Sequence, residues 1–386
     1  MIVVITDDLT GAAELGGLGL QYDLRVEIVT SADITSTAEL LIIATDTRSM
    51  TEQQAVEKMM ALTLAIPEIK PDLVFKKVDS VLRGHVITEL EVHMLLLNLN
   101  RAFLVPANPA LGRTLTNGKY FIDDEPIHLT SFANDPEFAH TSPDVLKMLR
   151  IKDSSIQVHQ VKNKLPSAGI IIGECAKPDD LKLWISKADK NTLLAGGSGL
   201  FIALLKSLNL NKKEAAAKEK PLNIKYPALF ICGSTHQKSK QAIKKAVSNK
   251  VPLSYMPANI IALPEPDEIL FENWADEIVS LLKKHKRAII AIDENTTRNI
   301  KAKAGSLRDK KAMVVKKIFQ KIAIKELFIE GGSTAAAIIN HLNLNRFSPV
   351  SEHGTGVVKM RSADVDGLFL TLKPGSYDWP ADIWNL

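Results

Sequence analysis

The sequence has few cysteines, few aromatic residues and little excess of charge. Its two cysteines, Cys175 and Cys232, form no C-x-x-C pair, which argues against a zinc ribbon or a disulfide framework and favours a reducing cytoplasm. The formal net charge is only +4, and aromatic residues make up 5% of the chain. Nucleic acid is therefore not an expected partner, because its recognition favours a concentrated basic patch and stacking aromatic rings.

Long apolar runs are also missing. No run approaches the roughly 20 residues that a membrane-spanning helix needs. The chain enters its first apolar run, IVVI, without the basic segment and cleavage site of a signal peptide. We therefore expect a cytoplasmic protein with no membrane partner.

The chain does contain a regular alternation of short apolar runs and helical stretches. The runs expected to be strands are residues 2–5, 40–45, 73–75, 102–105, 169–172, 192–196, 228–232, 288–292, 326–330 and 368–372. Helical spacing follows Thr51 and Val86, between two pairs of these runs. Such alternation is typical of an α/β fold in which helices cover both faces of a mainly parallel sheet.

A polar, lysine-rich stretch divides this pattern in two. At 386 residues the chain is longer than one hydrophobic core usually serves. Residues 209–226 lack apolar periodicity, whereas strand-like runs continue on both sides. The sequence predicts two α/β domains, residues 1–208 and 227–386, joined by a linker at 209–226. Each domain is expected to have a mainly parallel sheet flanked by helices, with the ligand cleft between the two.

Two acidic residues, Asp7 and Asp8, directly follow the first apolar run. In open parallel sheets, ligands bind beyond the carboxyl ends of the strands. Two ionised carboxylates are costly to bury without partners, so they are not expected to be ordinary core residues. One alternative is that an acid caps the following helix, and the other is that both belong to a binding site. The residues alone leave both roles open.

A denser charged cluster, FKKVDSVLRGH, follows the run at residues 73–75. It contains Lys77, Asp79, Ser80 and Arg83, and these suit an anionic, hydroxylated ligand because arginine binds carboxylates and aspartate accepts from hydroxyl groups. An ion-pair network that closes a turn is the alternative. Residues expected at the same edge of the sheet are Asp46, Arg48, Asn108, Gly112 and Arg113.

Three side chains at four-residue intervals, His85, Glu89 and His93, resemble a metal-binding helix face. Residues four apart drift around a helix by roughly 40° per step, so three ligands would need unusual reach. We expect these side chains to be exposed or to contact loops.

Glycine-rich turns follow strands in the second half. The segment CGS ends at Ser234, and GGST comprises Gly331, Gly332, Ser333 and Thr334. Glycine lets the backbone approach a phosphate, and the N-terminus of the next helix favours its charge. Each turn is weak evidence alone, and together with Gly375 after the last run they favour a nucleotide. The role of a further turn at residues 194–201 is left open.

Short motifs run in a fixed order along nearly the whole chain. They are TDDLTGA at 6–12, DTRS at 46–49, KKVDSVLRG at 76–84, PANPALGRT at 106–114, HLTSFANDP at 128–136, CGS at 232–234, GGST at 331–334 and KPGS at 373–376. Together they resemble the four-carbon acid sugar kinase family. The acidic opening combined with the K-x-D-S-x-L-R-G run is the specific part of this resemblance.

The resemblance implies an N-terminal domain that binds a threonate-, erythronate- or oxo-tetronate-like acid and a C-terminal domain that binds ATP with Mg²⁺. The terminal hydroxyl of the acid would be phosphorylated, with Asp8 or Asp79 as the general base. The matching substrate-side residues are Asp7, Asp8, Arg48, Lys77, Asp79, Ser80 and Arg83. The matching nucleotide-side residues are Ser234, Gly331, Gly332, Ser333, Thr334 and Gly375. The metal ligands are not identified, and a homo-oligomer is compatible with this interpretation.

The chain departs from the family pattern mainly near its C-terminus. Residues 352–356 read EHGTG and residues 373–378 read KPGSYD, and His85 stands where a small amide is common. These departures leave open a paralogue with altered activity. The alternatives are a non-catalytic sensor of a sugar acid or nucleotide, and another reaction on a similar acid, such as isomerisation of a phosphorylated acid. The sequence does not choose among the four-carbon acids.

Overall fold

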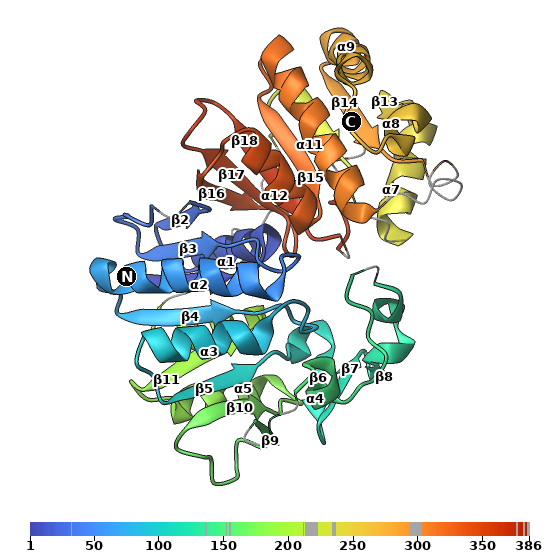
Figure 1. Cartoon of the computed structure of the whole chain (residues 1–386). Coiled ribbons are helices and arrows are strands. Elements are labelled where there is room, and N and C mark those ends of the chain that lie inside the picture. The colour runs from blue at the N-terminus through green and yellow to red at the C-terminus, as the bar shows by residue number, and fades with distance from the viewer. Residues whose placement is uncertain are drawn as a thin grey trace. The chain divides into compact units, whose positions relative to one another are not determined.

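The computed structural model describes residues 1–31, 33–135, 137–151, 153, 156–210, 212, 223–233, 237–293, 296, 303–375, 377–380 and 383. The chain forms two compact units, Met1–Lys213 and Glu214–Leu386, which we call unit 1 and unit 2 (Figure 1). Both contain a mainly parallel sheet flanked by helices, as the sequence predicts. The division between them falls within residues 209–226, and most of that predicted linker lies outside the described residues.

The main sheet of unit 1 is entirely parallel, with the strand order β2-β3-β1-β4-β11-β5-β10-β9. Its strands are β1 (Ile2–Thr6), β2 (Val26–Val29), β3 (Leu40–Ala44), β4 (Leu73–Lys77), β5 (Arg101–Val105), β9 (Gln157–His159), β10 (Gly169–Gly173) and β11 (Thr192–Gly196). Its α-helices are α1 (Leu9–Gln21), α2 (Glu52–Ala65), α3 (Val86–Leu96), α4 (Val145–Met148), α5 (Pro178–Lys187) and α6 (Ser198–Ser207).

The core of unit 1 forms because its central strands are apolar on both faces. Every residue of β1 is buried, as is typical of parallel strands covered by helices on both sides. Val3 and Ile5 of β1 pack with Ile43 of β3 and with Met59 and Leu62 of α2. This packing fixes the strand register and therefore the positions of the loops that follow the strands.

A small antiparallel sheet, which is not among the strands expected from the sequence, lies beside these loops. It consists of β6 (Arg113–Thr116), β7 (Lys119–Ile122) and β8 (Glu125–Pro126). The turn between β6 and β7 is Asn117-Gly118, and both residues have positive φ, 49° and 69°. An Asn-Gly pair with this geometry is a strong hairpin signal, so the sequence did carry the information.

The sheet of unit 2 has the order β13-β14-β12-β15-β18-β17-β16, in which β17 and β16 run antiparallel. Its strands are β12 (Ala228–Ile231), β13 (Leu253–Tyr255), β14 (Arg287–Ala291), β15 (Glu326–Glu330), β16 (Arg346–Glu352), β17 (Val358–Ser362) and β18 (Phe369–Lys373). Its helices include α7 (Gln237–Ser248), α8 (Ala258–Ala262), α9 (Glu268–His285), α11 (Ala304–Lys321) and α12 (Gly332–His341).

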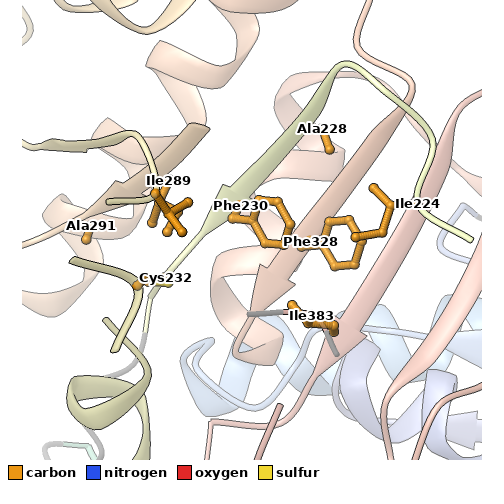
Figure 2. Packing of buried hydrophobic residues seen from close by; sticks show 10 residues of the cluster. Ile224, Ala228, Phe230, Cys232, Ile289, Ala291, Phe328 and Ile383 are labelled. Atoms are coloured by element: carbon orange, nitrogen blue, oxygen red, sulfur yellow. The ribbon is translucent and has the colours of Figure 1, made fainter. Parts of the chain in front are cut away.

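Stacked aromatic rings mark the core of unit 2 (Figure 2). Phe230 of β12 and Phe328 of β15 lie with ring centroids 4.3 Å apart and nearly parallel planes, next to Ile289 of β14. Burying such rings is among the larger apolar contributions to stability. Within the described part of the chain, no helix has the length and apolar character needed to cross a membrane.

Candidate functional site

The parallel strands of unit 1 end at one edge of the sheet. Thr6 at the end of β1 pairs with Ala44 of β3 and with Lys77 of β4, and Lys77 in turn pairs with Gly196 of β11. The register continues from Gly196 to Val105 of β5. Residues that follow these strands therefore meet in space although they come from distant parts of the sequence. The predicted substrate-side residues all lie in these loops or at the strand ends.

Arg48 joins the two aspartates that follow β1. Its Nε and Nη2 atoms bind the two carboxylate oxygens of Asp7 at 2.7 and 3.0 Å. Nη2 also lies 3.0 Å from Oδ1 of Asp8 and 3.7 Å from Oδ1 of Asp79. All three aspartates are buried, and the two-point contact of a guanidinium with a carboxylate is a strong ion pair. A shared arginine is thus what allows the adjacent acids to be buried.

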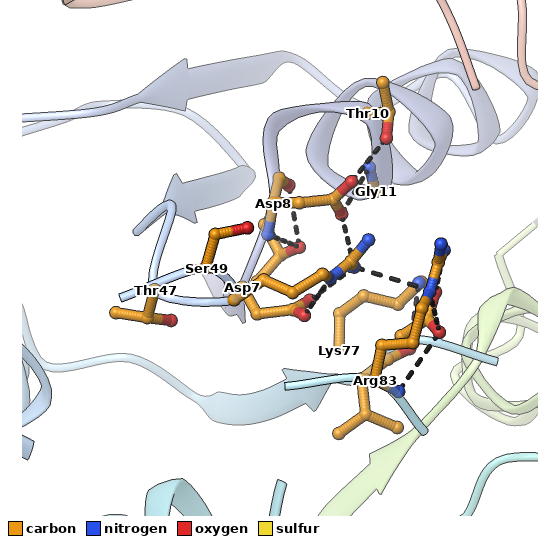
Figure 3. Close-up of polar contacts among 12 residues, drawn as sticks. Asp7, Asp8, Thr10, Gly11, Thr47, Ser49, Lys77 and Arg83 are labelled. Carbon is orange, nitrogen blue, oxygen red and sulfur yellow. Dashed lines mark hydrogen bonds and ion pairs between the residues drawn. The ribbon is translucent and has the colours of Figure 1, made fainter. Parts of the chain in front are cut away.

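Asp8 also caps helix α1, so the capping role that the sequence left open is real. Its Oδ1 accepts from the backbone N–H of Gly11 at 3.0 Å, and its other oxygen accepts from the hydroxyl of Thr10. Figure 3 shows Asp8 pointing toward both residues. A Cβ atom at Gly11 would lie only 2.7 Å from Asp8 Oδ1 and 3.5 Å from Nζ of Lys77. The glycine therefore keeps space open between the cap and the neighbouring lysine.

Arg83 forms a second ion pair of the same kind. Its Nε and Nη2 bind the two oxygens of Asp79 at 2.8 and 2.9 Å, and its Nη1 binds Asp135 at 3.2 Å. The backbone N–H groups of Val81 and Arg83 also donate to Asp79. The turn after β4 is thereby closed around Asp79, as the ion-pair alternative for this segment predicts.

Lys77 lies at the same edge and is buried. Its Nζ donates to the carbonyl of Val78 at 2.9 Å and lies 4.0 Å from a carboxylate oxygen of Glu14 on α1. Figure 3 shows Lys77 and Arg83 close together below Asp7 and Asp8. Glu14 is not evident from the sequence as part of this cluster, because its contribution depends on how α1 packs on the sheet.

The antiparallel sheet of unit 1 holds Ser80 in place. Arg113 of β6 donates to the hydroxyl of Ser80, and the Tyr120 hydroxyl of β7 donates to its carbonyl. Asn108 instead binds the hydroxyl of Ser198 at 3.2 Å, in the glycine turn whose role the sequence left open. Ser80 and Arg113, which are both expected at this edge of the sheet, are therefore in contact. Tyr120 and Ser198 also contact residues of this edge, and neither is a candidate from the sequence.

Burial and the surrounding charges together shift the pKa values of the three aspartates in different directions. Burial raises the pKa of Asp7, against the opposing effect of Arg48, and Asp8 adds to the rise. Burial also acts to raise the pKa of Asp8, but Arg48 and Lys77 outweigh it and the pKa is lowered. Burial acts to raise the pKa of Asp79 as well, but the effect of Arg83 and Arg48 is larger, and the pKa lies well below its ordinary value. Asp79 is therefore a weak base, and Asp7 is the most readily protonated of the three.

The side chains of His85, Glu89 and His93 are expected to be exposed or to contact loops, and this is correct only for His85. His85 contacts the loop carbonyl of Met50 at 2.8 Å. Glu89 and His93 are buried rather than exposed. Glu89 pairs with Lys76, whereas burial lowers the pKa of His93 well below its ordinary value.

The glycine turn of unit 2 lies between adjacent strands. Gly331 follows β15 with φ of +91°, a conformation that favours glycine. Its N–H donates to the carbonyl of Lys373 at the end of β18, and Gly375 follows two residues later. Gly332, Ser333 and Thr334 form the first turn of α12, and the N–H groups of a first helical turn, which have no partner within the helix, suit an anion. Ser234 lies outside the described residues.

The two C-terminal segments that depart from the family pattern contact each other. Gly356, in the turn between β16 and β17, has φ of +68°. A Cβ atom there would lie 2.7 Å from the ring of Tyr377. Glycine at 356 and tyrosine at 377 therefore fit together, so the departures at 352–356 and 373–378 form one local feature.

Metal ligands are not evident from side chains alone. Across the part of the chain that the structure describes, no group of three or more histidine, cysteine, aspartate or glutamate side chains could hold an ion. Asp7, Asp8 and Asp79 instead contact arginine. The arrangement can bind a small polar ligand through charged and hydroxyl groups.

Family models match both units. One described as a sugar-binding N-terminal domain matches residues 2–204, and one described as a nucleotide-binding C-terminal domain matches residues 229–377. A crystal structure of a Salmonella typhimurium LT2 protein has a TM-score of 0.78 to this chain at 17% identity, and the match covers 100% of this chain and 98% of that one. That likeness shows a shared fold.

Related proteins carry names of enzymes. A D-threonate kinase from Salmonella typhimurium is 24% identical, over 97% of this chain and 95% of its own length. A D-erythronate kinase from Heliobacterium modesticaldum is 24% identical, over 74% of this chain and 69% of its own length. A 3-oxo-tetronate kinase from Actinobacillus succinogenes is 20% identical, over 98% of this chain and 96% of its own length.

Proposed function

This chain belongs to the four-carbon acid sugar kinase family, and from that premise we propose that it transfers the terminal phosphate of ATP to the terminal hydroxyl of a four-carbon sugar acid. The names of its relatives, kinases of D-threonate, D-erythronate and 3-oxo-tetronate, support this class of substrate. The acid is proposed to bind unit 1, and the nucleotide is proposed to bind unit 2.

The buried cluster of aspartates and arginines at the end of β1 and β4 carries the proposal. A short hydroxy acid needs cationic donors for its carboxylate and acceptors for its hydroxyls, and this edge of the sheet offers both. Arg48 is well suited to the carboxylate, because its Nη1 atom donates to none of the described residues while Nε and Nη2 hold Asp7 and Asp8. Arg83 and Lys77 supply further positive charge beside it.

The base that accepts the hydroxyl proton is proposed to be Asp8 rather than Asp79. Asp79 accepts from Arg83 at two points and from two backbone N–H groups, which lowers its basicity. Asp8 has fewer donors and a smaller downward pKa shift. The raised pKa of Asp7 adds a third candidate that the sequence did not suggest for this role.

In the proposed reaction the substrate hydroxyl oxygen forms a bond to the γ-phosphorus of ATP while the bond from that phosphorus to the bridging oxygen breaks. ADP leaves, and the hydroxyl proton passes to the carboxylate. Mg²⁺ would supply charge neutralisation on the phosphates. It commonly binds through substrate phosphates, water and one or two carboxylates, which is consistent with the lack of a larger ligand group among the described side chains.

On the nucleotide side, Gly331–Thr334 and Gly375 are proposed to approach the phosphates. The positive φ of Gly331 and the start of α12 expose backbone N–H groups to an anion. Ser234 remains part of the proposal from its motif alone.

An assay of ADP release with ATP and Mg²⁺ across a panel of four-carbon acids tests the proposal. We expect release that depends on one or a few of these acids. Binding of acid and nucleotide without turnover would favour the sensor instead. Conversion of a phosphorylated acid without consumption of ATP would favour the isomerase.

A further inference from the structure

Helix α11 carries three buried lysines, and one of them differs from the others. Lys310 donates to the carbonyls of Ile261 and Leu263 at 3.1 and 2.6 Å. Lys317 pairs with two glutamates of α9. Lys311 is only 2% exposed, yet it forms no hydrogen bond or ion pair with any residue in the described part of the chain. The side chain as a whole is therefore buried, and its ammonium group has no partner among the described residues, whereas a buried lysine normally has one.

Two titratable groups that interact with Lys311 place it near the carboxyl ends of the strands. Its charge interacts with Cys232, which directly follows β12, and with Glu330, the last residue of β15. Figure 2 shows Cys232 at the end of its strand. Lys311 is in the first half of α11, and a helix that follows a parallel strand starts near the carboxyl edge of the sheet. Both observations put its charge at the same edge as the glycine turns.

Glu330 does not neutralise Lys311, because it is already engaged. Its Oε1 lies 2.6 Å from Nζ of Lys373, and its Oε2 accepts from the hydroxyl of Ser239. Glu330 and Lys373 thus form a closed pair of opposite charges. Lys311 adds one positive charge, and Arg308, one turn earlier on the same helix, is a second cation nearby. Arg308 lies 3.8 Å from a carboxylate oxygen of Asp309, so Lys311 is the one of these two cations left without an ion-pair partner among the described residues.

The glycine turns adjoin this charge. Gly233 directly follows Cys232, and Gly331 directly follows Glu330. A Cβ atom at Gly233 would lie 2.7 Å from the carbonyl oxygen of Glu330 and 2.4 Å from the hydroxyl oxygen of Thr334. The turn after β12 therefore packs directly against the start of α12, and Lys311 is close to the residues that precede both turns.

We propose that Lys311 binds the phosphate groups of the nucleotide, together with the backbone N–H groups of the turn at Gly331. This inference rests on the proposed function, since it assigns a specific cation to the proposed nucleotide side. A phosphate would supply the negative charge that the ammonium group lacks. Burial lowers the pKa of Lys311 to about 8, against the opposing effect of Cys232 and Glu330.

Lys311→Met tests the inference, because methionine keeps most of the length of the side chain without its charge. We expect the affinity for ATP, and for inorganic tripolyphosphate, to fall about 10- to 100-fold, as for loss of a hydrogen bond to a charged group. We expect affinity for adenosine, which has no phosphate, to change less than twofold. Calorimetry on the full chain measures all three. The melting temperature without ligand is expected to stay constant or rise, because an uncompensated buried charge is removed.

Lys310→Met is the matched control, since Lys310 is the preceding buried lysine of the same helix. It should lower the melting temperature by leaving the carbonyls of Ile261 and Leu263 without their donor. Its affinity for ATP should remain within twofold of the wild type.

The outcomes separate this inference from the proposed function. Equal affinity of the wild type and Lys311→Met for ATP and tripolyphosphate would overturn the role of Lys311, even if ADP release continued. The role of Lys311 would also be overturned if the wild type bound neither ATP nor tripolyphosphate. In a third outcome, Lys311→Met loses affinity for phosphate compounds, but no four-carbon acid stimulates ADP release from the wild type. That result would support the role of Lys311 and contradict the proposed reaction.

Discussion

At the scale of single residues, the candidate site is built from carboxylates that each contact an arginine. Asp7 and Asp8 share Arg48, and Asp79 is held by Arg83. Buried ion pairs of this kind lose most when one partner is removed, because the other is left charged and unpaired. Substitutions that preserve shape while changing charge are therefore the informative ones.

Asp8→Asn is predicted to lower turnover while leaving nucleotide affinity unchanged. Asparagine is a good helix cap, so the contact with Gly11 can persist and α1 should stay folded. Loss of a general base typically costs about 10²- to 10⁴-fold in rate. Measuring kcat and ATP affinity side by side checks this, and full turnover in the variant would remove Asp8 as the base. A larger loss in Asp7→Asn would transfer the role to Asp7.

Arg83→Ala is predicted to weaken acid binding at least tenfold, because it removes a cation from the cluster and leaves Asp79 and Asp135 repelling an anion. ATP affinity should be unaffected. Arg101→Ala is the control, since Arg101 lies at the opposite end of its strand and pairs with Asp189. Calorimetric titrations of both ligands check the prediction. Equal weakening of acid and ATP, or weakening of neither, would contradict the assignment.

Much of this cluster can be predicted from the sequence, because polar residues that follow apolar runs gather at one edge of a parallel sheet. Which of these side chains pair with each other cannot be predicted from the sequence. Arg48 and Asp7 meet because β1 and β3 align in a particular register, and Asp135 reaches Arg83 from a distant loop. Glu14 is missed for a similar reason, since the packing of α1 on the sheet is a tertiary property.

At the scale of elements, a buried network beneath the site joins β4, α3 and the loop after β3. Glu89 of α3 pairs with Lys76 of β4 and accepts from the hydroxyl of Thr47 at 2.6 Å. Thr47 directly precedes Arg48. The network therefore connects the packing of the helix to the position of the arginine.

Glu89→Ala is predicted to destabilise the protein by about 3–5 kcal/mol, because it leaves the ammonium of Lys76 buried without a partner. The double variant Lys76→Met with Glu89→Leu should recover most of that loss, since it removes both charges and keeps the volume. Chemical denaturation of Lys76→Met, Glu89→Leu and the double variant measures the coupling between the two side chains. Additive losses would show that the pair does not act as a unit.

The elements themselves are predicted well where apolar runs are long, as at β1, β3 and β15. The short strands β6, β7 and β8 are missed, although the Asn117-Gly118 turn marks the hairpin. Their burial is mixed rather than strictly alternating, so periodicity alone gives little signal. The antiparallel strands β16 and β17 are likewise not anticipated.

At the scale of the whole molecule, each unit is predicted to respond to its own ligand. Hydrogen exchange on the full chain should slow near residues 7–11 and 77–84 when the acid alone is added. It should slow near residues 331–335 when the nucleotide alone is added. The reason is that bound ligands suppress local opening of the backbone they contact. Protection by the acid confined to unit 2 would contradict the assignment of the acid to unit 1.

The central claim is that a terminal hydroxyl of a four-carbon acid receives the phosphate of ATP. Phosphorus NMR of the reaction, with ATP, Mg²⁺ and the acid that best stimulates ADP release, tests it most directly. The account predicts ADP together with a phosphomonoester whose phosphorus couples to the terminal methylene protons of the acid. ADP with inorganic phosphate and no phosphomonoester, or a phosphate on another oxygen of the acid, would contradict it.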